Sequence, residues 1–213
     1  MLIVHHLGKS QSERIVWLCE ELQIPYELKL YTRDPVTILA PPEYRALHPI
    51  GAAPVIQDGN VILAESGAIM DYILAKYGNG RLVPAANAPD FAAYLYWFHF
   101  ANGTLQPVMG RNMVLRRANL PDDNPVVVFV KERLDRALNY VERRLGEAPY
   151  FAGSVFTAAD IMTVFSLTTM RYFLPLDIKP YPNILAYLAR IGERAAYRTA
   201  MNKGDPGMPL LLT

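Results

Sequence analysis

Two closely spaced serines follow the first apolar stretch of the chain and are the first side chains placed to do chemistry. Leu2 to Val4 form a short apolar run typical of a buried strand, and Ser10 and Ser12 separate it from a stretch with helical periodicity. The tetrapeptide Ser10-Gln11-Ser12-Glu13 fits a capping box, which would explain Ser10 by structure alone. A hydroxyl accepts one hydrogen bond while donating another, so a capping role does not exclude a chemical one.

A second pair of polar residues, Glu65 and Ser66, precedes another predicted helix. Ile69, Tyr72 and Ile73 lie on one face of that helix. Backbone amides and the helix dipole favour an anion at a helix start, so the pair suits an anionic ligand. An ordinary serine N-cap is the alternative explanation.

Other reactive residue types have simpler structural explanations. Cys19 lies on the apolar stripe of the first predicted helix, where a buried thiol is expected, and a single cysteine excludes an internal disulfide. His5 and His6 stand at a strand end without further metal-ligand companions, so we expect no metal site. His48 precedes Pro49 and fits a turn residue.

The first eighty residues alternate strand and helix patterns around these positions. The order is strand, helix, strand, short helix, hairpin and helix, over residues 2–4, 15–22, 26–30, 43–47, 54–63 and 69–73. Asp58-Gly59-Asn60 marks the turn of the hairpin. This order predicts a small α/β domain.

The remaining chain is expected to be helical. Residues 78–89 are rich in Gly, Pro and Asn and form the clearest linker. Helical patterns then begin near residues 91, 124, 157 and 182. Thr157 and Asp160 resemble a capping box, so we expect them to stabilise a helix start. The predicted domains are 1–80 and 89–213, joined by a linker at 81–88.

Composition places the chain among ordinary globular proteins. Its 213 residues carry a formal net charge of +1, with 52% hydrophobic and 19% charged residues, which excludes general disorder. Near-neutral charge argues against nucleic acid or a membrane surface as a partner. The N-terminus lacks a signal-peptide pattern, and the apolar stretch from Phe91 to Ala101 is well short of the roughly 20 residues of a spanning helix. We therefore expect a cytoplasmic protein.

Four motifs occur in order along the chain. They run from His5 to Arg14, from His48 to Pro54, from Glu65 to Ile69 and from Tyr150 through Asp160. Together they resemble the glutathione S-transferases, in particular the Ser-type members of bacteria and fungi, over nearly the whole chain. The resemblance implies a thioredoxin-like α/β N-terminal domain that binds glutathione and an all-α helical-bundle C-terminal domain.

The resemblance also implies a catalytic serine. Ser10 would donate a hydrogen bond to the glutathione sulfur and favour the thiolate. Ser10 and Arg14 keep the Ser-x-x-x-Arg spacing of Ser-type relatives. Ser12 lies close to the same helix start, and the choice between the two serines stays open.

Further residues are implied to hold glutathione. Ala53 would pair its main chain with the cysteinyl backbone of glutathione, before a cis Pro54. Ser66 would bind the γ-glutamyl carboxylate and Glu65 the ammonium group. Ala52 departs from the pattern, because many relatives carry Lys or Gln there, facing the glycine carboxylate of glutathione.

The resemblance implies an enzyme that joins the glutathione thiolate to a small hydrophobic electrophile, with glutathione as co-substrate and no metal. The electrophile would bind near Met109, Arg111, Asn112 and Leu115. The family also implies a homodimer in which the N-terminal domain of one subunit meets the C-terminal domain of the other.

Two alternatives stay open. One is a glutathione-dependent thiol/disulfide reductase, which normally has a cysteine in place of Ser10, or a peroxidase. The other is a non-catalytic glutathione-binding or scaffold protein.

Overall fold

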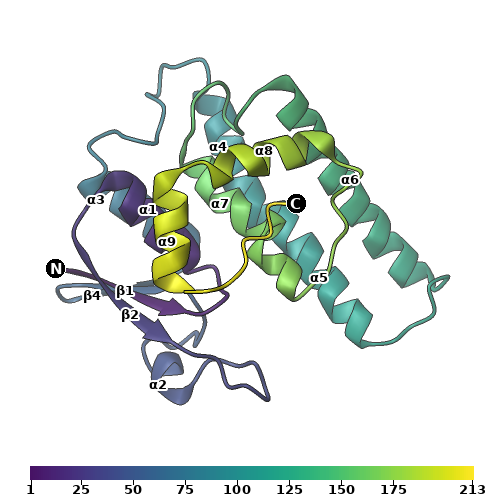
Figure 1. The fold of residues 1–213 in the computed structure, drawn as a ribbon, viewed down its shortest axis with the longest axis horizontal. Helices are drawn as coiled ribbons and strands as arrows, with labels where there is room; N and C mark the ends of the chain where they lie inside the picture. Colours follow the sequence, from purple (N-terminus) through teal and green to yellow (C-terminus); the bar gives the residue numbers. More distant parts are fainter. The chain divides into compact units, whose positions relative to one another are not determined.

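The computed structural model describes all residues from Met1 to Thr213. They form two compact units, the first of residues 1–83 and 191–210 and the second of residues 84–190 and 211–213 (Figure 1). The segment 191–210 therefore belongs to the same unit as the N-terminus, which no pattern in the sequence indicated.

The first unit is built on a four-stranded sheet. Its elements are β1 (Leu2–Leu7), α1 (Glu13–Leu22), β2 (Tyr26–Tyr31), α2 (Pro42–Arg45), β3 (Val55–Asp58), β4 (Val61–Ala64), α3 (Ser66–Tyr77) and α9 (Ala195–Gly204). The strand order is β2-β1-β3-β4, with β1 parallel to β2 and antiparallel to β3, and β3 antiparallel to β4. The crossover through α1 permits the parallel pair, and the short turn at Gly59 and Asn60 closes the antiparallel one.

Helix α1 forms the centre of the helical layer of this unit. Eight of its ten residues are buried, because α3, α9 and β1 all pack against it. Figure 1 shows α9 beside α1. Arg194 pairs with Glu21 at 2.7 Å and Lys203 with Glu20 at 2.6 Å, so both ends of α9 are tied to α1. These contacts explain why the C-terminal segment belongs to the first unit.

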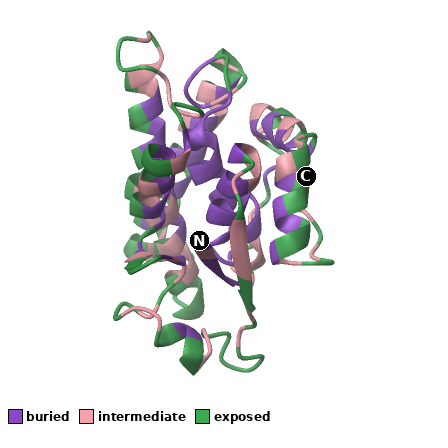
Figure 2. Ribbon diagram, turned by 90° about the vertical axis from the view of Figure 1, so that its left-hand side faces the viewer, coloured by how far each residue is buried: buried purple, intermediate pink, exposed green.

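The second unit is entirely helical. It contains α4 (Phe91–Phe100), α5 (Gln106–Arg117), α6 (Pro125–Glu147), α7 (Ala158–Leu167) and α8 (Pro182–Gly192), of which the last two residues belong to the first unit. A π-helical turn at Ala101–Leu105 continues α4 into α5, and a 3₁₀ helix at Thr169–Tyr172 follows α7. All ten residues of α7 are buried, and Figure 2 shows buried residues on the inner sides of the helices and exposed ones on the outer sides. The predicted fold class, an α/β domain followed by an all-α domain, is confirmed.

The start of α7 is fixed by the predicted capping box. Asp160 is fully buried and accepts hydrogen bonds from the amides of Phe151 at 3.0 Å and Thr157 at 2.8 Å. It also accepts from the hydroxyls of Thr157 at 3.3 Å and Tyr187 at 3.1 Å. Burial raises the pKa of Asp160 to about 6, and these hydrogen bonds oppose the shift. The structural role predicted for Thr157 and Asp160 is confirmed.

Candidate active site

The topology brings three segments to one end of the sheet. His5 is opposite Val55 in the antiparallel pair of β1 and β3, so the end of β1 lies beside the start of β3. Val55 is also opposite Ala64, the last residue of β4. The loop that follows β1, Pro54 before β3 and Glu65 after β4 therefore meet at this end.

The Ser10 hydroxyl does not cap α1. It accepts a hydrogen bond from the Ser12 amide at 3.2 Å, whereas the Glu13 amide donates to the Ser10 carbonyl at 3.1 Å. Helix α1 begins at Glu13, and its N-cap residue, Ser12, makes no side-chain cap. The predicted capping box over residues 10–13 is wrong, because the chain enters the helix through a tight turn and the two serine hydroxyls bond to each other at 2.7 Å.

The two serines differ in depth. Ser12 has no exposed surface, and its Oγ accepts a hydrogen bond from the Leu7 amide at 3.1 Å. Ser10 keeps 5% of its surface exposed. Of the two serines, Ser10 is therefore the one that keeps some exposed surface.

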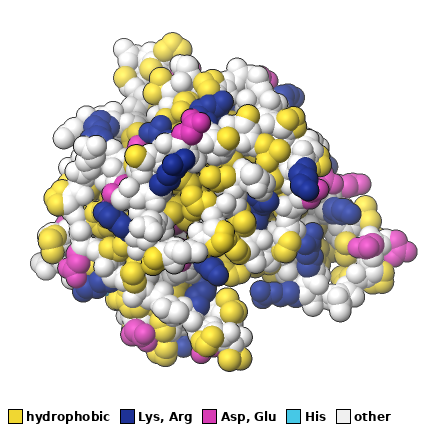
Figure 3. Space-filling view, viewed as in Figure 1, with side chains coloured by type: hydrophobic (Ala, Val, Ile, Leu, Met, Phe, Trp, Pro, Cys, Tyr) yellow, Lys and Arg dark blue, Asp and Glu magenta, His cyan; other side chains and the backbone are white.

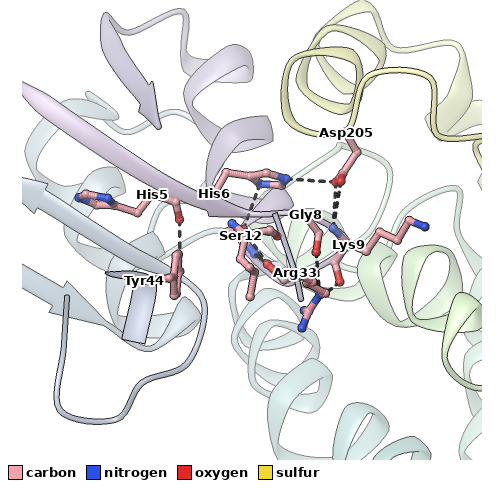
Figure 4. Close-up of polar contacts among 10 residues, drawn as sticks. His5, His6, Gly8, Lys9, Ser12, Arg33, Tyr44 and Asp205 are labelled. Carbon is pink, nitrogen blue, oxygen red and sulfur yellow. Dashed lines mark hydrogen bonds and ion pairs between the residues drawn. The ribbon is translucent and has the colours of Figure 1, made fainter. Parts of the chain in front are cut away.

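His6 connects Ser12 to the C-terminal segment (Figure 4). Its Nδ1 lies 3.0 Å from Ser12 Oγ, and its Nε2 lies 3.1 Å from Oδ2 of Asp205, which follows α9. The Lys9 amide donates to Oδ1 of the same carboxylate at 3.0 Å. Sequence reasoning missed this contact, since His6 and Asp205 are 199 residues apart and no local pattern joins them.

The neighbouring histidine, His5, makes different contacts. Its Nδ1 lies 2.9 Å from the hydroxyl of Tyr31, and its carbonyl accepts a hydrogen bond from the hydroxyl of Tyr44 at 3.3 Å. Burial lowers the pKa of His5. No group of three or more His, Cys, Asp or Glu side chains is arranged to hold a metal ion. The two histidines therefore have separate surroundings, although they are adjacent on β1.

The start of α3 is linked to the loop that carries Ser10. Glu65 is the N-cap residue with a φ of +72°, and Ser66 is the first residue of the helix. The Ser66 hydroxyl accepts from Arg14 Nη1 at 3.2 Å and donates to Gln11 Oε1 at 3.3 Å. Burial lowers the pKa of Arg14 to about 9, so it remains a cation at neutral pH. A buried positive charge thus adds to the helix dipole at a point suited to an anion.

The third segment is the turn before β3. The peptide bond between Ala53 and Pro54 is cis, as the resemblance implies. Ala53 is half-buried and packs against the apolar cluster around Leu7 and Tyr44. Ala52 is exposed and offers neither a charge nor a hydrogen-bonding side chain.

The four residues predicted to contact an acceptor all lie on α5 but do not form one surface. Asn112 and Leu115 line a cavity of about 290 Å³ between α5 and α6. The Asn112 amide also donates to one carbonyl of each of these helices, at 3.1 and 3.2 Å. Met109 is fully buried, and Arg111 is exposed outside the cavity. Only Asn112 and Leu115 are therefore placed at a common hollow.

The remaining residues and surfaces suggest no second centre of chemistry. Burial raises the pKa of the Cys19 thiol, which keeps it protonated inside α1. On the face drawn in Figure 3, basic side chains are scattered among acidic and apolar ones. None of the helices is long and apolar enough to cross a membrane.

Two family models match the chain. One, described as glutathione S-transferase, N-terminal domain, matches residues 10–76, and the other, glutathione S-transferase, C-terminal domain, matches residues 116–190. Glutathione S-transferase 3 of Schizosaccharomyces pombe is 33% identical over 218 residues, covering 95% of this chain and 88% of the relative. The N-terminal family model includes Ser10 and Ser66, and the match to the Schizosaccharomyces pombe relative covers nearly the whole chain.

Solved structures are similar over the same length. A glutathione S-transferase from Actinobacillus pleuropneumoniae superimposes with a TM-score of 0.87 at 33% identity, covering 96% of this chain and 93% of that one. A glutathione transferase family member from Pseudomonas fluorescens, solved with two glutathione molecules bound, has a TM-score of 0.77 at 21% identity, covering 94% and 92%. The second likeness shows the fold alone.

Proposed function

The chain belongs to the glutathione S-transferase family and is a glutathione transferase, and on this premise we propose that it joins the glutathione thiolate to a small hydrophobic electrophile. The observation that carries the proposal is the meeting of Ser10, the Ala53-Pro54 turn and the Glu65-Ser66 pair at one end of the sheet. Glutathione has a central thiol, a peptide backbone and a charged γ-glutamyl end. Each of the three segments offers a group that matches one of these parts.

Thiolate formation is within the reach of such a site. A thiol with a pKa of about 8.5 is only about 3% ionised at pH 7, and lowering its pKa by about two units needs around 2.7 kcal/mol. A hydrogen bond to a charged group contributes about 1.5–3 kcal/mol, and a helix N-terminus adds up to about 1 kcal/mol. The start of α1 supplies the Ser10 hydroxyl together with the helix dipole. Nucleophilicity falls as the thiol pKa falls, so most of the acceleration comes from holding the thiolate beside the electrophile.

Glutathione itself would be held by groups that the fold leaves at this end. The Ala53 main chain would bind the cysteinyl backbone, Ser66 the γ-glutamyl carboxylate and Glu65 the ammonium group. Arg14 donates to the Ser66 hydroxyl and strengthens the preference for an anion there. The glutathione molecules in the Pseudomonas fluorescens structure support this choice of co-substrate. Because Ala52 lacks a charge, the glycine carboxylate needs another partner or binds weakly.

The thiol/disulfide alternative has little support. That chemistry needs a reactive thiolate, and the one cysteine, Cys19, is buried with a raised pKa. The position that faces the ligand carries the Ser10 hydroxyl instead. We also propose a cytoplasmic location, where glutathione is kept reduced.

The acceptor is proposed to bind on α5, at Asn112 and Leu115. Their cavity of about 290 Å³ has room for a small molecule only. A hydrophobic acceptor would contact Leu115, and the partly exposed Asn112 would limit how deep it binds. Replacing Leu115 with Ala is expected to raise the KM for the acceptor and leave the KM for glutathione unchanged.

We further propose a homodimer, because both units expose apolar side chains. Val61 and Ile62 of the edge strand β4 are 41% and 53% exposed. Tyr96 is 49% exposed and lines a hollow of about 700 Å³ with Phe100 and Tyr140 on the second unit. Each surface would be covered by the other unit of a second copy. Light scattering that finds a monomer at micromolar concentration contradicts this assembly.

The conjugation reaction is tested with purified protein and a panel of electrophiles. Halides, epoxides, isothiocyanates and peroxides are each incubated with glutathione, and mass spectrometry follows the products: thioethers, dithiocarbamates or oxidised glutathione. Conjugates with at least one hydrophobic halide, epoxide or isothiocyanate support the proposal. Glutathione binding by calorimetry without any conjugate favours a non-catalytic binding protein, and oxidised glutathione formed from peroxides alone favours a peroxidase.

A further inference from the structure

Four polar side chains, those of Ser10, Ser12, His6 and Asp205, form a continuous series of hydrogen bonds. The first three residues are buried and Asp205 is partly exposed, and Figure 4 shows the part from Ser12 to Asp205. Ser10 Oγ lies 2.7 Å from Ser12 Oγ, which lies 3.0 Å from His6 Nδ1. His6 Nε2 lies 3.1 Å from Oδ2 of Asp205. Hydroxyls and imidazole nitrogens both give and accept protons, so a proton can pass along this series. We call these four residues the relay.

Asp205 sets the direction of the protons in the relay. A carboxylate only accepts hydrogen bonds, so His6 carries its proton on Nε2 and, when neutral, presents an acceptor at Nδ1. Ser12 Oγ accepts from the Leu7 amide, and two acceptors lie within reach of its own proton, the Leu7 carbonyl at 3.3 Å and His6 Nδ1 at 3.0 Å. The shorter contact directs the proton to His6. Ser10 then has Ser12 Oγ as the acceptor for its proton. At rest, every proton of the relay is directed toward Asp205.

We propose that the relay takes up the thiol proton of glutathione and stores it on His6, an inference that rests on the proposed contact of Ser10 with the sulfur. The thiol gives its proton to Ser10 Oγ, Ser10 gives its own to Ser12, and Ser12 gives its own to His6 Nδ1. One S–H and two O–H bonds break while two O–H bonds and one N–H bond form. The products are a thiolate that accepts a hydrogen bond from Ser10 and an imidazolium beside the Asp205 carboxylate.

Transfer reverses the hydrogen bonds between the sulfur and His6 and leaves the one from His6 to Asp205 in place, and this favours the thiolate. His6 then donates to Ser12, Ser12 donates to Ser10, and Ser10 donates to the sulfur. Hydrogen bonds in such a series strengthen one another. In water a thiol holds its proton more tightly than an imidazole, so the transfer depends on Asp205. The same order of carboxylate, imidazole and hydroxyl stabilises an imidazolium in the Ser-His-Asp triad.

The relay is not itself a hydrolytic triad. Ser12, the hydroxyl next to His6, has no exposed surface and accepts a hydrogen bond from the Leu7 amide. A nucleophile in that position cannot reach a substrate. Ser12 and His6 are therefore positioning residues that act through Ser10, the one serine of the relay that keeps exposed surface.

Three elements that surround the relay carry charged groups. From the end of α9, Asp205 contacts the ring directly. From the segment after β2, Arg33 donates to the two carbonyls that follow β1, and the Asp205 carboxylate counteracts the lowering of the Arg33 pKa by burial. From the first turn of α1, Glu13 and Arg14 are buried charged residues. Asp205 is the carboxylate in contact with the ring and the one that would stabilise an imidazolium.

The close fit of the C-terminal segment holds this geometry. A Cβ at Gly204 would lie 3.0 Å from Cε1 of the His6 ring, and one at Gly8 would lie 3.1 Å from Oδ1 of Asp205. The Lys9 amide holds the same carboxylate. Asp205 therefore has little freedom to leave the ring while α9 stays in place.

A proton count on the wild-type protein tests the relay directly. Glutathione binding is measured by calorimetry in buffers of different ionisation enthalpy, which gives the protons released, and by the ultraviolet absorbance of the thiolate. If His6 stores the proton, thiolate forms at neutral pH with far less than one proton released per thiolate. Release of one proton per thiolate overturns the relay. A protein that binds glutathione without forming thiolate contradicts the proposed role of Ser10 instead, so the two failures are distinguishable.

Variants sharpen the count. Asp205→Asn keeps a hydrogen-bonding group beside His6 but removes the charge that stabilises the imidazolium, and His6→Gln removes the proton acceptor. Both variants are expected to have a kcat at neutral pH that is lower by about tenfold or more, in the range of general base catalysis. Their kcat is expected to recover as the pH rises. They are expected to release one proton for each thiolate that forms.

The matched control is His5→Gln, a replacement on the same strand outside the relay. It is expected to leave the pH profile of kcat and the proton count unchanged. A loss of activity that is equal at every pH in Asp205→Asn, with an unchanged proton count, overturns the relay and leaves Asp205 a purely structural residue.

Discussion

The starts of α1 and α7 carry similar polar residues and use them in opposite ways. At α7, Thr157 and Asp160 bond to backbone amides and to Tyr187, so their polar groups are satisfied within the unit. At α1, the amides of the first turn bond to backbone carbonyls, and the hydroxyls of Ser10 and Ser12 bond to each other instead. A helix start whose side chains are not engaged as caps keeps groups available for a ligand. This difference separates the structural helix start at α7 from the proposed active site at α1.

The largest effect is expected at the start of α7, where the side chains have a structural role. Asp160→Ala leaves two buried amides and the Tyr187 hydroxyl without their acceptor. Each unsatisfied buried group costs about 1–3 kcal/mol, so the free energy of unfolding is expected to fall by more than about 3 kcal/mol. Denaturant titration measures the loss. Glutathione affinity per folded molecule should be unchanged, and a large drop in affinity with normal stability would contradict a structural role.

Ser66→Ala tests the start of α3, where one hydroxyl both bonds within the protein and is proposed to bind a ligand. The Ser66 hydroxyl is bonded to Arg14 and Gln11, and we propose that it also binds the γ-glutamyl carboxylate. Its removal leaves charged partners with one hydrogen bond fewer, so glutathione binding is expected to weaken by about 1–3 kcal/mol. The free energy of unfolding should fall by only about 1 kcal/mol, because Arg14 keeps its hydrogen bond to Gln11. Calorimetry that finds unchanged affinity contradicts the assignment.

Ser10→Ala tests the start of α1. Turnover with an activated aryl halide is expected to fall about tenfold, equivalent to about 1.4 kcal/mol of transition-state stabilisation. The pH at which activity appears should rise, because the thiolate loses its donor. Affinity for glutathione should change much less, since the contacts at Ala53 and Ser66 remain.

Thr163→Ala is the control for Ser10→Ala. Thr163 also has a buried hydroxyl, but it donates to the Ala159 carbonyl inside α7. Its removal is expected to leave the pH profile unchanged. If Ser10→Ala also leaves the profile in place, thiolate stabilisation comes from backbone amides or from another side chain.

The two helix starts also show what local sequence patterns can predict. The capping-box pattern was right at Thr157 and Asp160 because Phe151 and Tyr187 bond to Oδ1 of Asp160 and leave Oδ2 for the Thr157 amide. The same pattern was wrong at Ser10. Its hydroxyl bonds to Ser12, and Ser12 in turn bonds to His6, which is held by Asp205 from the other end of the chain. Periodicity predicted the strands and most helices, because each forms from neighbouring residues. It could not indicate that α9 packs on α1, since those contacts join residues far apart in sequence.

The carboxylates of Asp58 and Asp160 can be compared by how they make stability depend on pH. Oδ2 of Asp58 accepts hydrogen bonds from Lys76 at 2.7 Å, Tyr77 at 2.5 Å and Tyr72 at 2.9 Å, which ties β3 to α3. Lys76 and then Tyr77 lower the pKa of Asp58 to about 2. The pKa of Asp160 is shifted in the opposite direction, to about 6, by burial. The two carboxylates should therefore affect stability with opposite signs.

Replacing Asp58 is expected to change the free energy of unfolding less than replacing Asp160, and the change should depend clearly on pH. The pKa of Asp58 in the unfolded chain is about 3.9, so its contribution is present above about pH 4 and is lost as the pH falls toward 2. Asp58→Asn should lower the free energy of unfolding at pH 7 by about 1–2 kcal/mol and flatten its decline between pH 4 and pH 2. The raised pKa of Asp160 makes the opposite contribution, which is greatest below about pH 4 and is lost as the pH rises through 6. Denaturant titrations at several pH values separate the two. An Asp58→Asn protein whose stability declines as steeply as the wild type below pH 4 would show that the hydrogen bonds from α3 do not hold Asp58 as an anion.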